Sequence, residues 1–555
     1  MFVRVKDNPH SYRKSILVCY SKRINNKPRQ FVIKNFGTVK TEEEIDNLKY
    51  LADDWLVNFK KSFSNSNTNE IPQGSKMKEP IFIPHIVSIG RINISMLEVI
   101  NKMYEELDFK KLLSKEDTDV LIKTLCARLY EPASKRRTSW LIDKKFSCKI
   151  LPDRIYRMLD KLWDKREKIE EKIFNKTLDE TEGKVDLMFF DVTTLSFETN
   201  NEDELRAFGF SKDCKSHHVQ VVVALATTSS GLPIGYKLFP GNTAEVNTLI
   251  ACVDYWKANI AIRDITVVAD RAMLSKKNLE CLEKHNIKYI VACPLRKLSN
   301  DLKEEVTLSV GYNLRDCCGA ISWIKEISLN NQQRLIVTYN RSRHCKDKKD
   351  REKTIERLLK KLGKTKNMKR LVSNNNMLKY IDIDGNSFGS LNDEKIADAA
   401  KWDGLHGVVT NSDLKALDIV SKYKNLWVIE ESFRISKNDL EMRPIYHYTP
   451  KRIQAHILLC FISFAIVRFV QKKLLDHGYK YSVRNILDYI NDVEAIVLHD
   501  TLMKEYYRLL SMPSEEIKII YEVMDLPNSK EVNAAYYEEY KYEKPKEDEE
   551  YEYYF

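Results

Sequence analysis

Between residues 185 and 295 short apolar runs alternate with helical segments, and this order restricts the fold more than any other feature of the chain. Five runs predict strands: VDLMFF, HVQVVVALAT, LPIGYKLFPG, DITVVAD and KYIVACP. TSSG predicts a hairpin turn between the second and third runs. Helical spacing in AEVNTLIACVDYWKA, and again from residue 275, separates the last three runs. This order predicts an α/β fold with a mixed sheet.

Two of the predicted strands end in an aspartate, Asp191 after LMFF and Asp270 after TVVA. Ligands of such sheets bind outside the carboxyl ends of the strands. Two carboxylates at that edge repel each other, which favours a cation between them, and hard oxygen ligands select Mg²⁺ or Mn²⁺. Because Asp also commonly begins a turn after a strand, each residue taken alone leaves both interpretations open.

A third carboxylate lies in YKNLWVIEESFRISK, which predicts a helix. At steps of three or four residues one side of this helix carries Tyr423, Trp427, Glu430, Arg434 and Lys437. The carboxylate suits a metal site, and the cations and rings suit phosphates and unstacked bases. A helix with a Glu430–Arg434 ion pair beside core aromatics fits the same residues.

The pattern resembles the DDE transposases of bacterial insertion sequences, which have an RNase H-like core. One large group of them carries the signature Y-x2-R-x3-E-x6-K. Tyr423, Glu430 and Lys437 match it, and Leu426 stands where the Arg is expected. The resemblance runs from about residue 90 to 475 and includes FFDVTTLSFE, GFSKDCKSHHVQVVVAL, LPIGYKLFPGNTAE, VVADRAMLSKKNLE and LEMRPIYH.

The resemblance implies an RNase H-like mixed five-stranded sheet with flanking helices. A large insertion would interrupt this sheet, and a mainly helical N-terminal region would precede it. Asp191, Asp270 and Glu430 would hold two Mg²⁺ or Mn²⁺ ions for phosphoryl transfer. Tyr423 and Lys437 would contact the transposon end, and the helical face adds Trp427 and Arg434 as DNA contacts.

The implied reaction is DNA transposition in two steps at double-stranded transposon ends. Water first attacks the phosphodiester at the end, and the freed 3′-OH then attacks target DNA. The resemblance also implies a homodimer on DNA. Transposases of this kind act as DNA endonucleases and recombinases, and a hairpin route of cleavage stays open.

Changes in composition and in helix or strand patterning divide the chain into six expected regions. These are an N-terminal β-hairpin and helix (1–75), a helical DNA-binding region (76–180), the catalytic core (181–295 and 401–475), an insertion domain (296–400), a C-terminal helical region (476–534) and a disordered tail rich in acids and Tyr (535–555).

Charge and apolar content bear on partners and location. The formal net charge is +11, and residues 341–370 carry 14 Lys or Arg against 4 Asp or Glu. Such an excess suits nucleic acid, although a charge run is also commonly a solvated helix face. The longest apolar run, residues 457–467, is shorter than the roughly 20 residues of a membrane span and predicts a core helix. With scattered cysteines and no signal peptide, we expect a bacterial cytoplasmic, nucleoid-associated protein without a membrane.

Three other functions stay open. One is an RNase H-like metal-dependent nuclease without strand transfer, because it would use the same three carboxylates. A second is a transposase-derived DNA-binding protein that has lost catalysis, although the intact Asp, Asp and Glu argue against it. The third is a basic structural or RNA-binding factor whose match to the signature is accidental.

Overall fold

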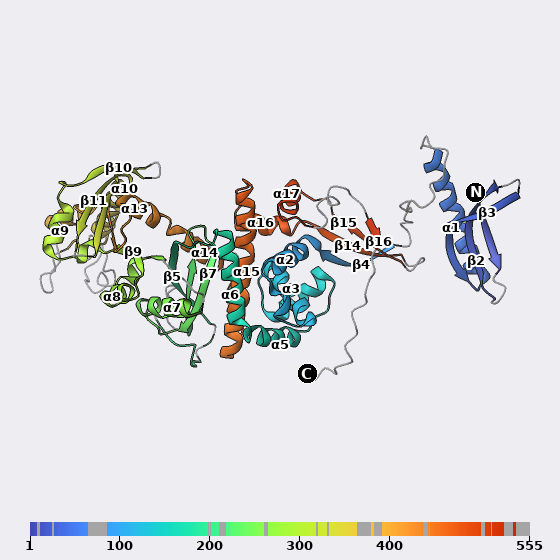
Figure 1. Ribbon diagram of the computed structural model, residues 1–555, viewed down its shortest axis with the longest axis horizontal. Helices are drawn as coiled ribbons and strands as arrows, with labels where there is room; N and C mark the ends of the chain where they lie inside the picture. The colour runs from blue at the N-terminus through green and yellow to red at the C-terminus, as the bar shows by residue number, and fades with distance from the viewer. Residues whose placement is uncertain are drawn as a thin grey trace. The chain divides into compact units, whose positions relative to one another are not determined.

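The computed structural model divides the chain into two compact units, one of residues 1–92, 494–512 and 534–555 and one of residues 93–493 and 513–533 (Figure 1). The structure describes residues 1–7, 12–24, 27–64, 86–197, 199, 201–209, 218–259, 265–317, 320–329, 332–362, 379–381, 391–436, 442, 445–500, 505–511, 513–526 and 537–539.

The first unit contains two small antiparallel sheets. Strands β1 (Phe2–Asp7), β2 (Lys14–Ile24) and β3 (Lys27–Val39) form one, and helix α1 (Glu42–Ser64) packs against it through Trp55. A capping box begins α1, since Thr41 N–H donates to Glu44 Oε2 and Glu44 N–H donates to Thr41 Oγ1. The other sheet has the order β16 (Tyr537–Glu539), β15 (Glu505–Leu510), β14 (Glu494–Asp500) and β4 (Ile86–Asn93).

The second unit begins with helices. Asn93, Ser114 and Ser134 each accept a hydrogen bond from a backbone N–H three residues on, so that three of the helices begin at a side-chain cap. The helices are α2 (Ile94–Glu106), α3 (Lys115–Tyr130), α4 (Lys135–Phe146), α5 (Pro152–Trp163) and α6 (Arg166–Glu180), with the 3-10 turn η2 (Phe109–Lys111) between α2 and α3.

A nine-stranded mixed sheet forms the centre of the second unit, in the order β10-β11-β12-β13-β9-β8-β5-β6-β7. β5 runs parallel to β8, and β8 runs parallel to β9, while the other neighbours are antiparallel. The strands are β5 (Leu187–Ser196), β6 (Gln220–Thr227), β7 (Pro233–Pro240), β8 (Thr266–Ala269), β9 (Lys288–Cys293), β10 (Asn313–Cys317), β11 (Ala320–Ser328), β12 (Arg334–Tyr339) and β13 (Leu405–Thr410).

The mixed α/β character of the prediction is confirmed, but the sheet is larger than five strands. The predicted strands are β5 to β9, and β9 would be the edge strand of a sheet made of these five alone. β13 pairs with that edge, and β12, β11 and β10 extend the sheet beyond it. Three strands of the expected insertion therefore continue the central sheet, because an open strand edge offers unpaired backbone groups to the next strand.

Helices cover both faces of the sheet. Buried side chains of α6, α7 (Glu245–Asn259) and α8 (Lys276–Lys284) form a core with Met188, Phe190 and Val267 on one face. α13 (Ala416–Lys424) and α14 (Trp427–Arg434) pack on the other face. The remaining elements are η3 (Arg271–Met273), η4 (Leu295–Lys297), α9 (Asn300–Thr307), α10 (Arg341–Leu362), α12 (Asp393–Ala400), α16 (Val483–Ile490) and α17 (Glu515–Val523).

Helix α15 (Pro450–Asp476) contains the longest apolar run and lies between the sheet and helices α2, α3 and α5 (Figure 1). Among the described residues it is the one helix that is long and apolar enough to cross a membrane, but 94% of its most apolar window is buried inside the structure. It packs against β7 and α5, which is how the core helix of a globular domain behaves.

Candidate active site

Asp191 and Asp270 lie side by side on two neighbouring parallel strands. The β5–β8 register pairs Phe190 with Ala269, and each of these residues is followed directly by one of the two aspartates. The expected strand end at Asp191 is wrong, because β5 continues to Ser196 by pairing with β6. β8 does end at Ala269, and Asp270 begins the turn η3.

Both aspartates belong to the face of the sheet that α14 covers. Side chains alternate along a strand, so Asp191 shares a face with Phe189, and Asp270 shares one with Val268. Met188, Phe190, Val267 and Ala269 point the other way, into the core with α7 and α8. Asp191 Oδ1 accepts a 2.7 Å hydrogen bond from the Val192 N–H. Asp270 Oδ1 accepts a 2.6 Å bond from the Arg271 N–H, and its side chain is exposed.

Glu430 belongs to α14, which packs against β5 and β6, and its side chain is exposed while Val428, Ile429, Ser432 and Phe433 are the buried residues of this helix. The predicted single helix is two helices, because Asn425 and Leu426 form a tight turn with backbone bonds to residues three positions earlier. Such bonds change the angular step between residues, so the side of α13 that carries Tyr423 is not continued by regular helical spacing into α14. Leu426, which replaces the Arg of the signature, is buried.

The predicted DNA contacts differ in their exposure. Trp427 is 56% exposed, and the Arg434 side chain is 49% exposed. The expected Glu430–Arg434 ion pair is absent from the described residues, where Arg434 Nη2 instead lies 3.7 Å from Glu431 Oε1. Lys437 lies outside the described residues. The Trp427 ring and the Arg434 guanidinium are thus both exposed, and their assignment as DNA contacts stays a prediction.

His406 of β13 is a residue that the sequence interpretation missed. It contacts Tyr423, whose hydroxyl in turn interacts electrostatically with Asp270 and Glu430. The rings of Tyr423 and His406 lie 5.1 Å apart between centroids. Burial, together with the charges of Asp270 and Glu430, raises the pKa of the Tyr423 hydroxyl, which therefore stays protonated at neutral pH. Burial and the cation of Arg343 lower the pKa of His406 to about 4, so its imidazole is neutral.

Metal ligation is only partly formed in this arrangement. No three His, Cys, Asp or Glu side chains within the described ranges group closely enough to hold one metal ion. Asp191 and Asp270 are nevertheless neighbouring carboxylates on one face of the sheet, and their oxygens are the donors that Mg²⁺ and Mn²⁺ take. Two carboxylates are a donor set that suits a divalent cation, and the assignment of Glu430 as a third ligand stays a prediction.

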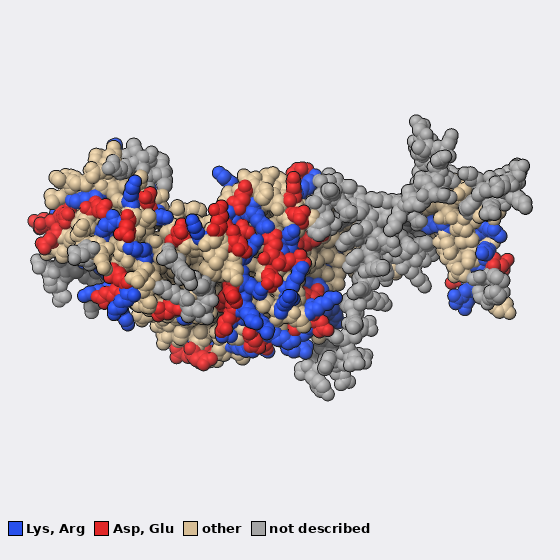
Figure 2. Space-filling view, viewed as in Figure 1, with Lys and Arg blue, Asp and Glu red and all other residues tan. Residues whose placement is uncertain are grey.

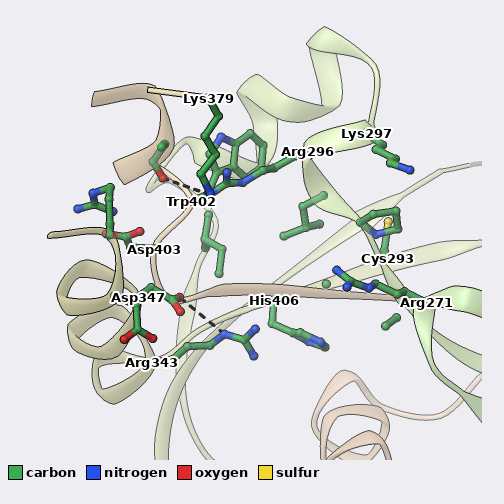
Figure 3. A pocket seen from close by; sticks show the side chains of 18 of the residues that line it. Arg271, Cys293, Arg296, Lys297, Arg343, Asp347, Lys379, Trp402, Asp403 and His406 are labelled. Atoms are coloured by element: carbon green, nitrogen blue, oxygen red, sulfur yellow. Dashed lines mark hydrogen bonds and ion pairs between the residues drawn. The ribbon is translucent and has the colours of Figure 1, made fainter. Parts of the chain in front are cut away.

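A pocket of about 820 Å³ opens beside Asp270 (Figure 3). It lies among the ends of β8 and β9, the turn η4, helix α10 and the start of β13. Its lining cations are Arg271, Arg296, Lys297, Arg343, Arg351 and Lys379. The basic run at residues 341–370 was the only sequence signal for it, since Arg343 and Arg351 of α10 belong to that run.

A second basic segment, Lys135 to Arg137, begins α4. Lys135 is buried at 3% exposure and lies against His456, so it faces away from solvent. Arg137 Nε lies 3.1 Å from Glu131 Oε1, and its guanidinium lies over the Trp140 ring. Acidic and basic side chains are interspersed over the described surface that Figure 2 shows, so the net charge is not gathered into one patch on that face.

Comparison with known proteins places this site in a family. No curated protein matches the chain. Among the solved structures that match is the cryo-EM structure of a piggyBac transposase synaptic complex with hairpin DNA, with 8% identity, a TM-score of 0.39 and coverage of 72% of this chain and 77% of that one. A likeness at this score supports no inference about the present chain.

The family model described as transposase DDE domain matches residues 183–466. This match spans just over half of the 555 residues and includes Asp191, Asp270 and Glu430. The resemblance noted in the sequence is thereby confirmed, and the chain belongs to the DDE transposase family.

Proposed function

We propose that this transposase binds the terminal repeats of a transposon, cleaves the DNA there and joins the 3′-OH ends to target DNA. The observation that carries the proposal is the position of Asp191 and Asp270 on adjacent parallel strands, on the face that α14 covers. Two acidic side chains thus share one face of the sheet, and the helix that packs on this face carries Glu430.

In the proposal Asp191, Asp270 and Glu430 hold two divalent ions, Mg²⁺ or Mn²⁺. Two carboxylates side by side repel each other, and a divalent ion between them would offset this repulsion, which supports cation binding on physical grounds. When bound, such ions supply activation of the attacking water and stabilisation of the leaving 3′ oxygen. DDE transposases generally depend on divalent metal ions, which also supports the assignment.

The side chains around the carboxylates would bind and orient the DNA. Tyr423 keeps its proton and donates from its hydroxyl to a phosphate oxygen next to the reacting bond. Trp427 offers an exposed ring for an unstacked base, and Arg434 an exposed cation for the backbone. Lys437, which follows the same segment of chain, would add a second cation.

Three broader assignments belong to the same proposal. Strands β7-β6-β5-β8-β9 would form the RNase H-like part of the sheet, in an insertion-sequence transposase of the bacterial cytoplasm. Residues 76–180 would read the terminal repeat, because the face with the carboxylates needs to hold only phosphates. The protein would act as a homodimer that pairs two ends, and sedimentation with end DNA would contradict this if one protomer held both ends.

The test uses labelled copies of the terminal repeats that flank the gene, with Mg²⁺ and a supercoiled target. Wild type should cut at the repeat ends and give joined products. Glu430→Gln should bind the repeats with unchanged affinity and give neither product. Glu431→Gln, one residue away on the same helix, serves as the matched control and should retain both activities.

Each alternative function has its own outcome in this test. Cleavage without joined products identifies a metal-dependent nuclease. Specific binding of the repeats without cleavage by wild type identifies a DNA-binding protein that has lost catalysis. Cleavage that survives Glu430→Gln unchanged removes Glu430 from the metal site.

A further inference from the structure

His406 of β13 lies on the same face of the sheet as Asp270. Val409 packs into the core on the opposite face, and because side chains alternate along a strand, His406, three residues earlier, points the other way. The register connects the two strands, since Val291 of β9 pairs with Ala269 on one side and with Val409 on the other. β13 is therefore two strands away from β8, and His406 belongs to the surroundings of Asp270.

The backbone of His406 is held in place from several sides. β13 pairs with both β12 and β9, and Thr338 of β12 lies opposite His406. Thr338 Oγ1 also donates a 3.3 Å hydrogen bond to the His406 carbonyl. In the turn before β13, Gly404 has a φ of +78°, and its N–H donates to Asp347 Oδ2 at 3.0 Å. His406 is thus a side chain on a rigid element, which suits it to hold a more mobile neighbour in place.

Tyr423, by contrast, stands at the end of a helix. α13 ends at Lys424, one residue later, and the chain then tightens at Asn425. Among the described residues no group forms a hydrogen bond with the Tyr423 hydroxyl. Its ring packs on His406, with centroids 5.1 Å apart and planes inclined by 36°. This contact restricts the side-chain torsions of Tyr423 and therefore the direction in which its hydroxyl points.

The His406 imidazole offers its neighbour a ring face and not a polar atom. Its nitrogens form no hydrogen bond within the described ranges, whereas the buried His456 has its Nε2 3.4 Å from the Met442 carbonyl. His406 is half-buried and lines the pocket beside Asp270 (Figure 3). A histidine that only completed a core would be enclosed and hydrogen-bonded. The position of His406 therefore points to a role at the site.

We infer that His406 is a positioning residue of the reaction. Its imidazole supports the ring of Tyr423, and this support keeps the Tyr423 hydroxyl beside Asp270 and Glu430. The inference rests on the proposed function for the task of that hydroxyl, which donates to a phosphate oxygen next to the reacting bond. His406 contacts no reacting atom and acts through Tyr423, so its effect depends on the presence of the hydroxyl.

The first experiment is a double-mutant cycle on cleavage by the full-length protein. Cleavage of labelled terminal-repeat DNA in a single turnover, with saturating protein and Mg²⁺, is measured for wild type, His406→Ala, Tyr423→Phe and the double variant. His406→Phe keeps an aromatic ring and removes both nitrogens. His344→Ala is the matched control, because it removes a different ring contact of the same unit, with Tyr339 at 5.8 Å between centroids.

Tyr423→Phe should lower the cleavage rate about 10- to 100-fold, the size of one hydrogen bond to a charged group. His406→Ala should lower it about 5- to 50-fold, because a misplaced group loses much of its contribution, and should leave affinity for the repeats in EDTA within about twofold. In the Tyr423→Phe background the same change should cost less than about twofold, since no hydroxyl remains to be positioned. His406→Phe should stay within about threefold of wild type. His344→Ala should cleave as wild type does.

A second measurement requires no catalysis, which separates the inference from the proposed function. Tyr423→fluorotyrosine places a fluorine atom on the ring, and its NMR resonance in EDTA reports the neighbouring ring and the mobility of this side chain. His406→Ala should shift the resonance and narrow it, because an unsupported ring moves faster. His406→Phe should keep a resonance of wild-type width.

Four results would overturn the inference. His406→Ala would cleave as wild type does, it would slow cleavage by the same factor with and without the Tyr423 hydroxyl, His406→Phe would be as slow as His406→Ala, or the fluorine resonance would not respond to His406→Ala. Thermal unfolding of each variant tests whether the fold persists, and a general loss of stability would slow both backgrounds equally. Absence of cleavage by wild type would contradict the proposed function, and the fluorine resonance would still decide whether His406 supports Tyr423.

Discussion

Side chains of like charge lie close together in two places in the second unit, and the two places differ in their exposure to solvent. On the face of the sheet that α14 covers, Asp191 and Asp270 adjoin each other, and Asp270 is exposed while Asp191 is half-buried. Where α4 meets α15, Lys135 Nζ lies 3.5 Å from His456 Nδ1, and both residues are buried with Arg128 and His447. Water reaches the first group and is excluded from the second.

The consequence is a difference in protonation. Burial, together with the charge of Arg128, lowers the pKa of Lys135 to about 7, and burial lowers the pKa of His447 to about 3. These groups relieve their repulsion by losing protons. Asp270 is exposed to solvent, so under the proposed function a cation from solution would bind between it and Asp191. Solvent access therefore separates a site poised to bind ions from a cluster that serves packing.

The sharpest test of this contrast removes one carboxylate. Asp191→Asn and Asp270→Asn should each reduce DNA cleavage by about a thousandfold or more, because the metal-dependent stabilisation of the transition state amounts to several kcal/mol. Mg²⁺ should raise the melting temperature of wild type and leave that of both variants unchanged. Asp413→Asn removes an exposed carboxylate that pairs with Lys288, and it should behave as wild type. Cleavage retained by either variant would contradict the metal site.

Alkaline stability tests the buried cluster. Lys135 has a pKa of about 7 in the folded chain and about 10.5 when unfolded, so the unfolded chain holds the extra proton between these values. Stability should therefore rise with pH from about 7 to about 10.5, by about 1.4 kcal/mol per unit from this residue. Lys135→Met should remove that rise in urea unfolding curves. A slope identical to wild type would show that Lys135 is charged in the fold.

Acid stability tests the histidines of the same cluster. His447 faces Lys135, Arg452 and Arg128, with Asp160 opposing them, and its pKa of about 3 lies below the unfolded value of about 6.5. Stability should fall as pH drops from about 6.5 towards 3, by about 1.4 kcal/mol per unit for this group. His447→Asn should make the fall shallower, while His477→Asn, an exposed histidine at the end of α15, should not.

The smallest effect is expected at the surface ion pair next to the cluster. Glu131 and Arg137 are each 44% exposed and 3.1 Å apart, so water screens their attraction. Glu131→Ala should change the free energy of unfolding by less than about 0.5 kcal/mol. A decrease in the free energy of unfolding above about 1 kcal/mol would contradict the assumption that solvent weakens exposed charge interactions relative to buried ones.

Much of the catalytic region could be predicted from local pattern. The apolar runs gave β5 to β9 and the helices between them, because strand and helix periodicities are local properties of the sequence. The same reasoning identified α15 as a core helix from its apolar run. The carboxylates were found because two strand-like runs were each followed directly by an aspartate.

Local pattern failed where neighbours in space decide the outcome. Nothing in YKNLWVIEESFRISK breaks a helix, yet the chain tightens at Asn425 and buries Leu426 beneath α14. Lys135 stands in the basic triplet KRR, whose sequence gives no sign of burial, and it is buried against His456 of α15. The assignments of Trp427, Arg434 and Lys437 to DNA stay predictions.

The sequence by itself determined strands β5 to β9, the core helix α15 and the family, since spacing along the chain is enough for these. Tertiary structure alone decided that Asp191 adjoins Asp270, because residues 79 positions apart meet only through the β5–β8 register. It also decided that the insertion strands extend the sheet, and that Arg296, Lys379 and Trp402 meet beside the carboxylates. The physical reason is that pairing and burial depend on long-range contacts, which no local periodicity encodes.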